Sequence, residues 1–226
     1  MSKTTLPAQT PPRISCHLID LGLIDYAKAY AIQLEKIKEV FVTQTPQLLI
    51  CEHFPILTLG RVSKEDNFVL PRSHIEQSGV PVVSIDRGGE ITFHGPGQIV
   101  IYPIFELSAW GRDLKRFMYK LEETAIDLLR VFGIVANRME GQRGIFVQQD
   151  KIGSIGIGVK KWVSFHGMSL NVNTDLRYYQ MIRPCGMDVA MTSMRQMAGK
   201  PFDMAEVKAV MARCFEKEFN LILHNA

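Results

Sequence analysis

Apolar residues recur at helical spacing in two long segments of this 226-residue chain. The segment from Asp25 to about Thr43, "DYAKAYAIQLEKIKEVFVT", predicts an amphipathic helix with Asp25 placed to cap it. Residues 113–133, "DLKRFMYKLEETAIDLLRVFG", predict a second helix, with an aspartate near its start and Gly133 where a C-terminal stop belongs. Roughly the last 20 residues are predicted to form a C-terminal helix.

Shorter apolar runs between polar, glycine-containing or proline-containing turns predict strands. Structure is expected to begin at "ISCHLIDLG", and the run at 80–87 is predicted to be buried. The predicted strands outnumber the predicted helices. They also do not alternate regularly with the helices, and such alternation is what βαβ units require. The pattern therefore predicts an α+β domain with a mixed or antiparallel sheet. The later strands are predicted at 47–53, 56–61, 80–87, 98–107, 143–159 and 162–174, with turns at "QQDK" and at "KK".

Composition narrows the class of protein. Residues 1–13, rich in Pro, Thr and Ser, are expected to form a loose tail, and residues 14–226 a single domain. With 46% hydrophobic and 22% charged residues, and no apolar run near the roughly 20 residues that span a bilayer, no membrane contact is expected. The N-terminus resembles neither a signal peptide nor a transit peptide, which favours the cytoplasm. A net charge of +3 is too small to imply nucleic acid, although it suits an acidic protein partner.

Four cysteines lie far apart without a C-x-x-C pair, so we expect reduced thiols, no metal and no disulfide framework. Cys16 and Cys51 occur in apolar strand patterns and Cys214 on the apolar face of a helix, where a free cysteine behaves as a small hydrophobe. Cys185, in "MIRPCGMDV", occupies a Pro-Cys-Gly turn that can present its thiol at a surface. Cys185 is therefore the candidate nucleophile.

Three segments combine glycine with a predicted strand: "RGGEITFHGPGQ" at 87–98, "DKIGSIGIG" at 150–158 and "FHGMSLNV" at 165–172. Such glycines indicate a bulge, a turn or a close approach to the backbone. Each alone favours a structural role, but together with His94 and His166 they predict a shared pocket. The first segment matches no known phosphate-binding loop, so a nucleotide is not required. Arg87 could hold a carboxylate or phosphate, or form a structural salt bridge.

A nucleophilic cysteine needs a neighbour that favours its thiolate. A free thiol has a pKa of about 8.5, and lowering it to around 7 takes roughly 2 kcal/mol. The glycine-containing segments offer Lys151, Lys160, Lys161, His94 and His166 for this role. Lysines 160 and 161 occupy a predicted turn in solvent, whereas Lys151 begins the strand that enters the pocket. Lys151 is therefore the preferred partner.

These segments resemble the protein octanoyltransferases of lipoate synthesis, the LipB type, which use octanoyl-carrier protein. The resemblance runs from about "HFPILTLGR" to "TSM", and it rests on "RGGEITFHGPGQIVIYPI", on "KIGSIGI" followed by "HGMSLNVN", and on "IRPCGM" followed by "TSM". Several long motifs in one order make it specific. It implies the fold of lipoate and biotin ligases, a mixed sheet flanked by helices.

The resemblance also implies roles for particular residues. Cys185 would carry the octanoyl (or lipoyl) group as a thioester, and Lys151 beside it would lower the thiol pKa. Ser154 and Ser169 stand where alanine is commoner in the family, which bears on chain-length preference. The implied acyl contacts come from three segments: Arg87, Gly88, Gly89, Glu90, Ile91, Thr92, Phe93 and His94; Ser154, Ile155 and Gly156; and Gly167, Met168 and Ser169.

The implied donor is octanoyl-acyl-carrier protein, and the implied acceptors are apo lipoyl domains such as 2-oxoacid dehydrogenase E2 subunits and the glycine cleavage H protein. Because thioester exchange is nearly energy-neutral, no ATP and no cofactor are expected. The protein is expected to be a monomer. An ATP-dependent lipoate or biotin ligase is the main alternative, although the chain lacks the basic triple-glycine loop of ligases. A non-catalytic binding module with a structural Cys185 is a second alternative. A cysteine peptidase is disfavoured because the motifs account for both histidines.

Overall fold

The computed structural model describes residues 12–183 and 189–226. The predicted tail therefore lies almost wholly outside the described residues. Eight strands form one sheet in the order β11-β1-β2-β6-β10-β9-β8-β7. β1 pairs parallel with β11 and with β2, and the remaining neighbours are antiparallel, so the predicted mixed sheet is confirmed. The strands are β1 (Ile14–Ile24), β2 (Gln47–His53), β6 (Gln98–Ile104), β7 (Asn137–Met139), β8 (Gln142–Val147), β9 (Asp150–Lys160), β10 (Val163–Asn171) and β11 (Leu221–Asn225).

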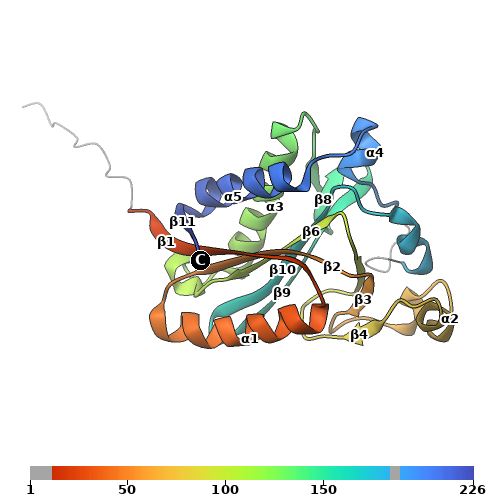
Figure 1. Ribbon diagram of the computed structural model, residues 1–226, viewed down its shortest axis with the longest axis horizontal. Helices are drawn as coiled ribbons and strands as arrows, with labels where there is room; N and C mark the ends of the chain where they lie inside the picture. Colours follow the sequence, from red (N-terminus) through yellow and green to blue (C-terminus); the bar gives the residue numbers. More distant parts are fainter. Residues whose placement is uncertain (1–11, 184–188) are drawn as a thin grey trace, which may run out of the picture.

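Helices cover both faces of this sheet (Figure 1). α1 (Tyr26–Thr43) lies on one face, and α3 (Leu114–Val131) and α5 (Met204–Phe219) lie together on the other. The larger core cluster fills the α3 and α5 side, and a smaller one packs under α1. The sheet therefore separates two apolar layers, which is what an α+β domain needs to bury both sheet faces.

A second, three-stranded sheet packs at one end of the molecule. Its order is β4-β3-β5, with β3 (Ile56–Leu59), β4 (Val82–Ser84) and β5 (Ile91–His94). Its own core contains Leu57, Ile75 and Phe93. The short helices are η1 (Glu65–Asn67), α2 (Arg72–Gln77), η2 (Leu107–Trp110), η3 (Leu176–Met181) and α4 (Met194–Ala198). None of the helices in the described part of the chain combines the length and hydropathy that crossing a bilayer requires.

The two long predicted helices are confirmed, with one difference in capping. Asp113 caps α3 by accepting a hydrogen bond from the Arg116 amide at 3.0 Å. Asp25 occupies the N-cap of α1, but its carboxylate makes no capping hydrogen bond and instead lies 3.5 Å from the Lys28 ammonium. The predicted position is therefore right, whereas the predicted cap contact is absent from the described residues.

Two predictions about secondary structure are wrong in part. The C-terminal helix ends at Phe219, Asn220 turns left-handed at φ +55°, and Leu221–Asn225 form β11 instead. The distant β1 supplies the strand pairing of β11, so local periodicity does not reveal it. The run 80–87 is a strand only at Val82–Ser84, and it is the edge of the second sheet, with Val83 exposed.

Candidate active site

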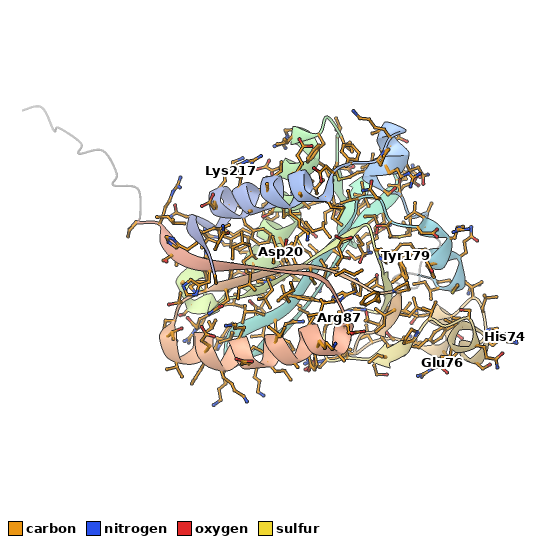
Figure 2. All side chains as sticks on the ribbon, viewed as in Figure 1. Asp20, His74, Glu76, Arg87, Tyr179 and Lys217 are labelled. Carbon is orange, nitrogen blue, oxygen red and sulfur yellow. The ribbon has the colours of Figure 1, made fainter. Side chains whose placement is uncertain are left out.

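A cavity of about 480 Å³ lies against the large sheet, and its lining includes Tyr26 of α1 and Met118 of α3. Side chains and backbone from β9, β10 and β5 line it, together with the loop that carries Arg87, Gly88 and Gly89. Figure 2 shows Arg87 beside the end of α1, on the side of the second sheet. Every residue for which an acyl contact is expected lines this cavity except Phe93, whose ring stacks on Tyr178 at 4.4 Å in the core of the second sheet. The contact itself stays a prediction.

Glycine at two positions lets the Arg87–Gly89 loop lie directly against the strands. A Cβ on Gly156 of β9 would stand 2.8 Å from the Gly88 carbonyl oxygen and 2.9 Å from Arg87 Cδ. A Cβ on Gly60 would stand 2.1 Å from the Gly89 carbonyl oxygen. The Gly88 amide donates to the Ile157 carbonyl at 2.9 Å, which joins the loop to β9. The loop thus forms a wall of the cavity, because no side chain separates it from the sheet.

Arg87 holds this wall to the second sheet. Arg87 is 7% exposed, and its guanidinium donates to the Thr58 carbonyl at 2.8 Å and to Thr58 Oγ1 at 3.0 Å. It also donates to the Gly88 carbonyl at 3.0 Å. These contacts make Arg87 a structural link between β3 and the loop, while it also lines the cavity.

Lys151 is the second residue of β9 and is 2% exposed in the cavity wall. Its amide donates to the Ala190 carbonyl at 2.8 Å, and its carbonyl accepts from the Thr192 amide at 2.9 Å. Gly144, at φ +126°, makes room for the lysine stem, since a Cβ there would stand 2.6 Å from Lys151 Cε. Cys185 lies outside the described residues, and its role stays a prediction.

The structure distinguishes among the cations considered for the thiolate. Burial lowers the pKa of His94 to about 3 and the pKa of His166 to about 4, so both imidazoles are neutral near pH 7. The Lys161 ammonium lies 5.0 Å from the Phe41 ring centre in the exposed turn between β9 and β10. Of the five candidates, Lys151 alone is both a lysine and part of the cavity lining.

The two neutral histidines are fixed by hydrogen bonds. His166 Nε2 lies 2.8 Å from Asp86 Oδ1 and its Nδ1 lies 3.4 Å from the Tyr26 hydroxyl. The carboxylate can only accept, so Nε2 carries the proton and Nδ1 accepts from Tyr26. His94 Nδ1 lies 2.6 Å from Gln98 Oε1, which is likewise an acceptor. The backbone of His166 has a φ of +53°, which is unusual within a strand. The contacts of its ring with Asp86 and Tyr26 hold this conformation.

Several lining residues were not predicted from the sequence. Tyr26 belongs to a predicted helix, but no local pattern indicates that its ring stacks on His94, with centroids 6.3 Å apart. The others come from segments to which no function was assigned. The lining residues outside the predicted set include Tyr26, Val62, Tyr102, Met118, Gln142 and Arg143.

The three described cysteines are buried and unpaired, as expected. Burial raises the pKa of the Cys16 thiol to about 12 and also raises the thiol pKa of Cys51 and of Cys214. A thiol with a raised pKa is a poor nucleophile at neutral pH. The interpretation of these three as small hydrophobes is confirmed.

Comparison with solved structures defines the class of protein. A lipoate protein ligase from Thermoplasma acidophilum superposes with a TM-score of 0.74 over 95% of this chain and 87% of its own, at 12% identity. The biotin protein ligase from Aquifex aeolicus, solved with biotin and ATP, superposes with a TM-score of 0.57 over 90% of this chain and 70% of its own, at 15% identity. At these identities the likeness shows the fold alone, which is that of the lipoate and biotin ligases.

Sequence comparison is more specific. Residues 25–216 match the family of the lipoyl protein ligase A/B catalytic domain. The octanoyltransferase of Syntrophotalea carbinolica is 41% identical over 87% of this chain and 91% of its own. The octanoyltransferase of Maridesulfovibrio salexigens is 42% identical over 89% of this chain and 95% of its own. The chain belongs to the octanoyltransferase family, whose catalytic domain is the lipoyl protein ligase A/B type. The resemblance seen in the motifs is thereby confirmed.

Proposed function

We propose that this protein transfers an octanoyl group from octanoyl-acyl-carrier protein to a lysine of an apo lipoyl domain, with Cys185 as the acyl carrier. Relatives named octanoyltransferases, 41% and 42% identical over most of the chain, support the acyl group and the reaction class. The observation that carries the mechanism is Lys151, a buried lysine in the cavity wall whose backbone is bonded to Ala190, five residues after Cys185.

The first half-reaction is a thioester exchange. The Cys185 thiolate attacks the carbonyl carbon of the donor thioester, a new carbon–sulfur bond forms, and the bond to the carrier sulfur breaks. The carrier leaves as a thiolate and takes up the proton that Cys185 had given to Lys151, which leaves Lys151 neutral for the second half-reaction. The ammonium of Lys151 favours the Cys185 thiolate by its charge. One thioester replaces another, so no ATP is consumed.

The second half-reaction forms an amide. The neutral amine of the acceptor lysine attacks the octanoyl-Cys185 carbon, the nitrogen–carbon bond forms, and the thiolate of Cys185 leaves. The amine loses a proton, which Lys151 in its neutral form accepts as a general base. Backbone amides of the glycine-containing segments stabilise the tetrahedral oxyanion. Because the amide is more stable than the thioester, this step draws the sequence forward.

The cavity accounts for an acyl tail. Its volume of about 480 Å³ falls in the range of small-molecule pockets, and burial of each methylene contributes about 0.8 kcal/mol. Discrimination between neighbouring chain lengths is then only a few-fold per methylene unless a wall closes the cavity. In this proposal the acceptors of the acyl group are the lipoyl domains of 2-oxoacid dehydrogenase E2 subunits and the glycine cleavage H protein. The reaction takes place in the cytoplasm, and a single domain spanning residues 14–226 catalyses it.

Intact-protein mass spectrometry tests the proposal. Wild type, Cys185→Ala and Cys214→Ala are each mixed with octanoyl-carrier protein without ATP. We expect an octanoyl adduct on wild type and on Cys214→Ala, absent from Cys185→Ala and discharged by apo lipoyl domain. Cys214 is the matched control because it is a buried cysteine on α5, away from the cavity lining. Product that forms only with ATP and free octanoate would instead identify a ligase.

A further inference from the structure

Two serines face each other in the cavity floor. Ser154 of β9 and Ser169 of β10 are direct register partners in the antiparallel pair, and both line the cavity. The neighbours of Ser169 along the strand, Met168 and Leu170, belong to the core on the α3 and α5 side. Because side chains alternate along a strand, Ser169 points to the opposite face, the one shared with Val100, its register partner on β6 and also a lining residue. Ser154 shares that face with its register partner.

The hydroxyls of both serines lack a hydrogen-bond partner among the described residues. Ser169 is nevertheless only 4% exposed. Ser164, on the same strand, shows the contrast: its hydroxyl donates to the Pro103 carbonyl at 2.7 Å and accepts from the Phe105 amide at 3.1 Å. Thr92 Oγ1, which also lines the cavity, is likewise buried without a partner in the part of the chain that the structure describes. The apolar cavity thus contains hydroxyls that find no hydrogen-bond partner within residues 12–183 and 189–226.

A saturated acyl chain cannot satisfy these hydroxyls. When an alkyl chain covers them, they lose contact with water and gain nothing in return, which weakens binding. An acyl chain that carries its own oxygen can accept from one serine and donate to the other. Opposite residues of an antiparallel pair have Cβ atoms about 5 Å apart, which leaves space for one oxygen between two hydroxyls.

We propose that Ser154 and Ser169 form a subsite for an oxygen substituent on the acyl chain, so that this protein accepts hydroxyacyl thioesters besides the saturated octanoyl thioester. The inference rests on the proposed acyl transfer and specifies the substrate class of that cavity. Ser154 lies on β9 between Lys151, at the reacting end, and Gly156, at the Arg87–Gly89 wall. The oxygen is therefore placed along the chain, away from the thioester carbonyl.

Competition between acyl donors tests this subsite. Wild type is mixed with equal amounts of octanoyl-carrier protein and one of its 3-, 5- or 7-hydroxyoctanoyl forms, and the adducts, which differ by one oxygen, are counted in one mass spectrum. For at least one hydroxyl position, we expect the ratio of hydroxyacyl to octanoyl adduct to fall about tenfold or more in the double variant Ser154→Ala, Ser169→Ala. The octanoyl adduct is expected to form faster in that variant.

The single variants show whether both serines contact the same oxygen. Ser154→Ala and Ser169→Ala are expected to be non-additive for the hydroxyacyl donor and additive for the octanoyl donor. Ser164→Ala is the control: it removes a buried hydroxyl from β10 outside the cavity, so it lowers thermal stability without changing the adduct ratio. An unchanged ratio in the double variant at every hydroxyl position would overturn the subsite, whatever the octanoyl rate.

Failure of the subsite is distinguishable from failure of acyl transfer. Wild type that forms no adduct with any donor contradicts the transfer mechanism. Titration calorimetry with free octanoate and the free hydroxyoctanoates then measures the subsite without any reaction. We expect a hydroxyoctanoate whose affinity falls about tenfold in the double variant; equal losses for octanoate and every hydroxyoctanoate would overturn the proposal.

Discussion

The main chain of Lys151 is hydrogen-bonded to Thr192, whose amide donates to the Lys151 carbonyl at 2.9 Å. The Lys151 amide in turn donates to Ala190 at 2.8 Å. The side chain of Lys151 takes no part in either bond. The position of Lys151 beside the segment that follows Cys185 is therefore set by backbone hydrogen bonds. A substitution at Lys151 removes the side-chain charge without removing these hydrogen bonds.

Replacement of Lys151 by Met keeps the buried stem and removes the ammonium. We expect acylation of Cys185 to slow by about 100-fold or more near pH 7, and the deficit to shrink as the pH approaches about 8.5, where a free thiol ionises unaided. Rapid-quench mass spectrometry of the adduct across this pH range measures both effects. Lys160→Met, at the exposed end of β9, is the control and should acylate normally. An acylation rate that stays at the wild-type value in Lys151→Met would contradict the assignment.

Gly144→Ala displaces Lys151 without replacing it. The added Cβ would stand 2.6 Å from Lys151 Cε and 2.6 Å from the Gly153 carbonyl oxygen. A shift of about 1 Å in a catalytic group can cost about 100-fold in rate, so we expect a loss of that order in the same acylation assay. Gly111→Ala is the matched control, because Gly111 also has positive φ but its Cβ would meet nothing within 4 Å. Equal acylation in the two variants would contradict the role of Gly144.

Gly156→Ala tests the close packing of the cavity wall. Its Cβ would meet the Gly88 carbonyl oxygen at 2.8 Å, so the loop must move away from β9. We expect the free energy of unfolding to fall by about 1 to 3 kcal/mol in chemical denaturation. At Gly88 a Cβ would stand 3.5 Å from the Ile157 carbonyl oxygen, an ordinary contact, so Gly88→Ala should stay within about 1 kcal/mol of wild type. Equal stability of the two variants would show that the wall adjusts freely.

Acid destabilises the fold through its buried histidines. Burial lowers the pKa of His94 to about 3 and of His166 to about 4, below the ordinary value of about 6.5 that the unfolded chain has. Between those values the unfolded state binds more protons, so stability is lost as the pH falls from about 6.5. We expect each histidine to contribute a loss of about 2 kcal/mol between pH 7 and pH 5.

Denaturant titrations at pH 7 and pH 5 measure this loss for wild type and for His94→Gln, which removes one titrating group. The pH-dependent difference in the free energy of unfolding should be smaller in the variant by about 2 kcal/mol. His74, in the exposed α2, supplies the control: His74→Gln should leave the difference unchanged. A His94→Gln protein with the full wild-type pH dependence would contradict the burial of a neutral imidazole.

Local pattern was sufficient for the elements that carry their own signal. The periodicity of α1 and α3 places each long helix to within a few residues, because an amphipathic helix makes its hydrogen bonds within itself. Turn residues likewise separate β8, β9 and β10, which are sequential antiparallel strands. The motifs also identified the family, since several long segments occur in one order.

Elements that depend on distant partners could not be read in this way. β11 exists because β1, some two hundred positions earlier in the chain, supplies its hydrogen bonds, and β4 is an exposed edge because β3 covers only one side of it. For the same reason no local signal joins Tyr26 of α1 to His94 and His166.

The sequence by itself determined the residue types of the candidate site, the order of its motifs and the family. Tertiary structure decided which residues share the cavity, that His94 and His166 are neutral, and that Ser154 faces Ser169 across two strands. The physical reason is range: propensity and periodicity act within a few residues, whereas burial, strand register and pKa depend on groups that only folding brings together.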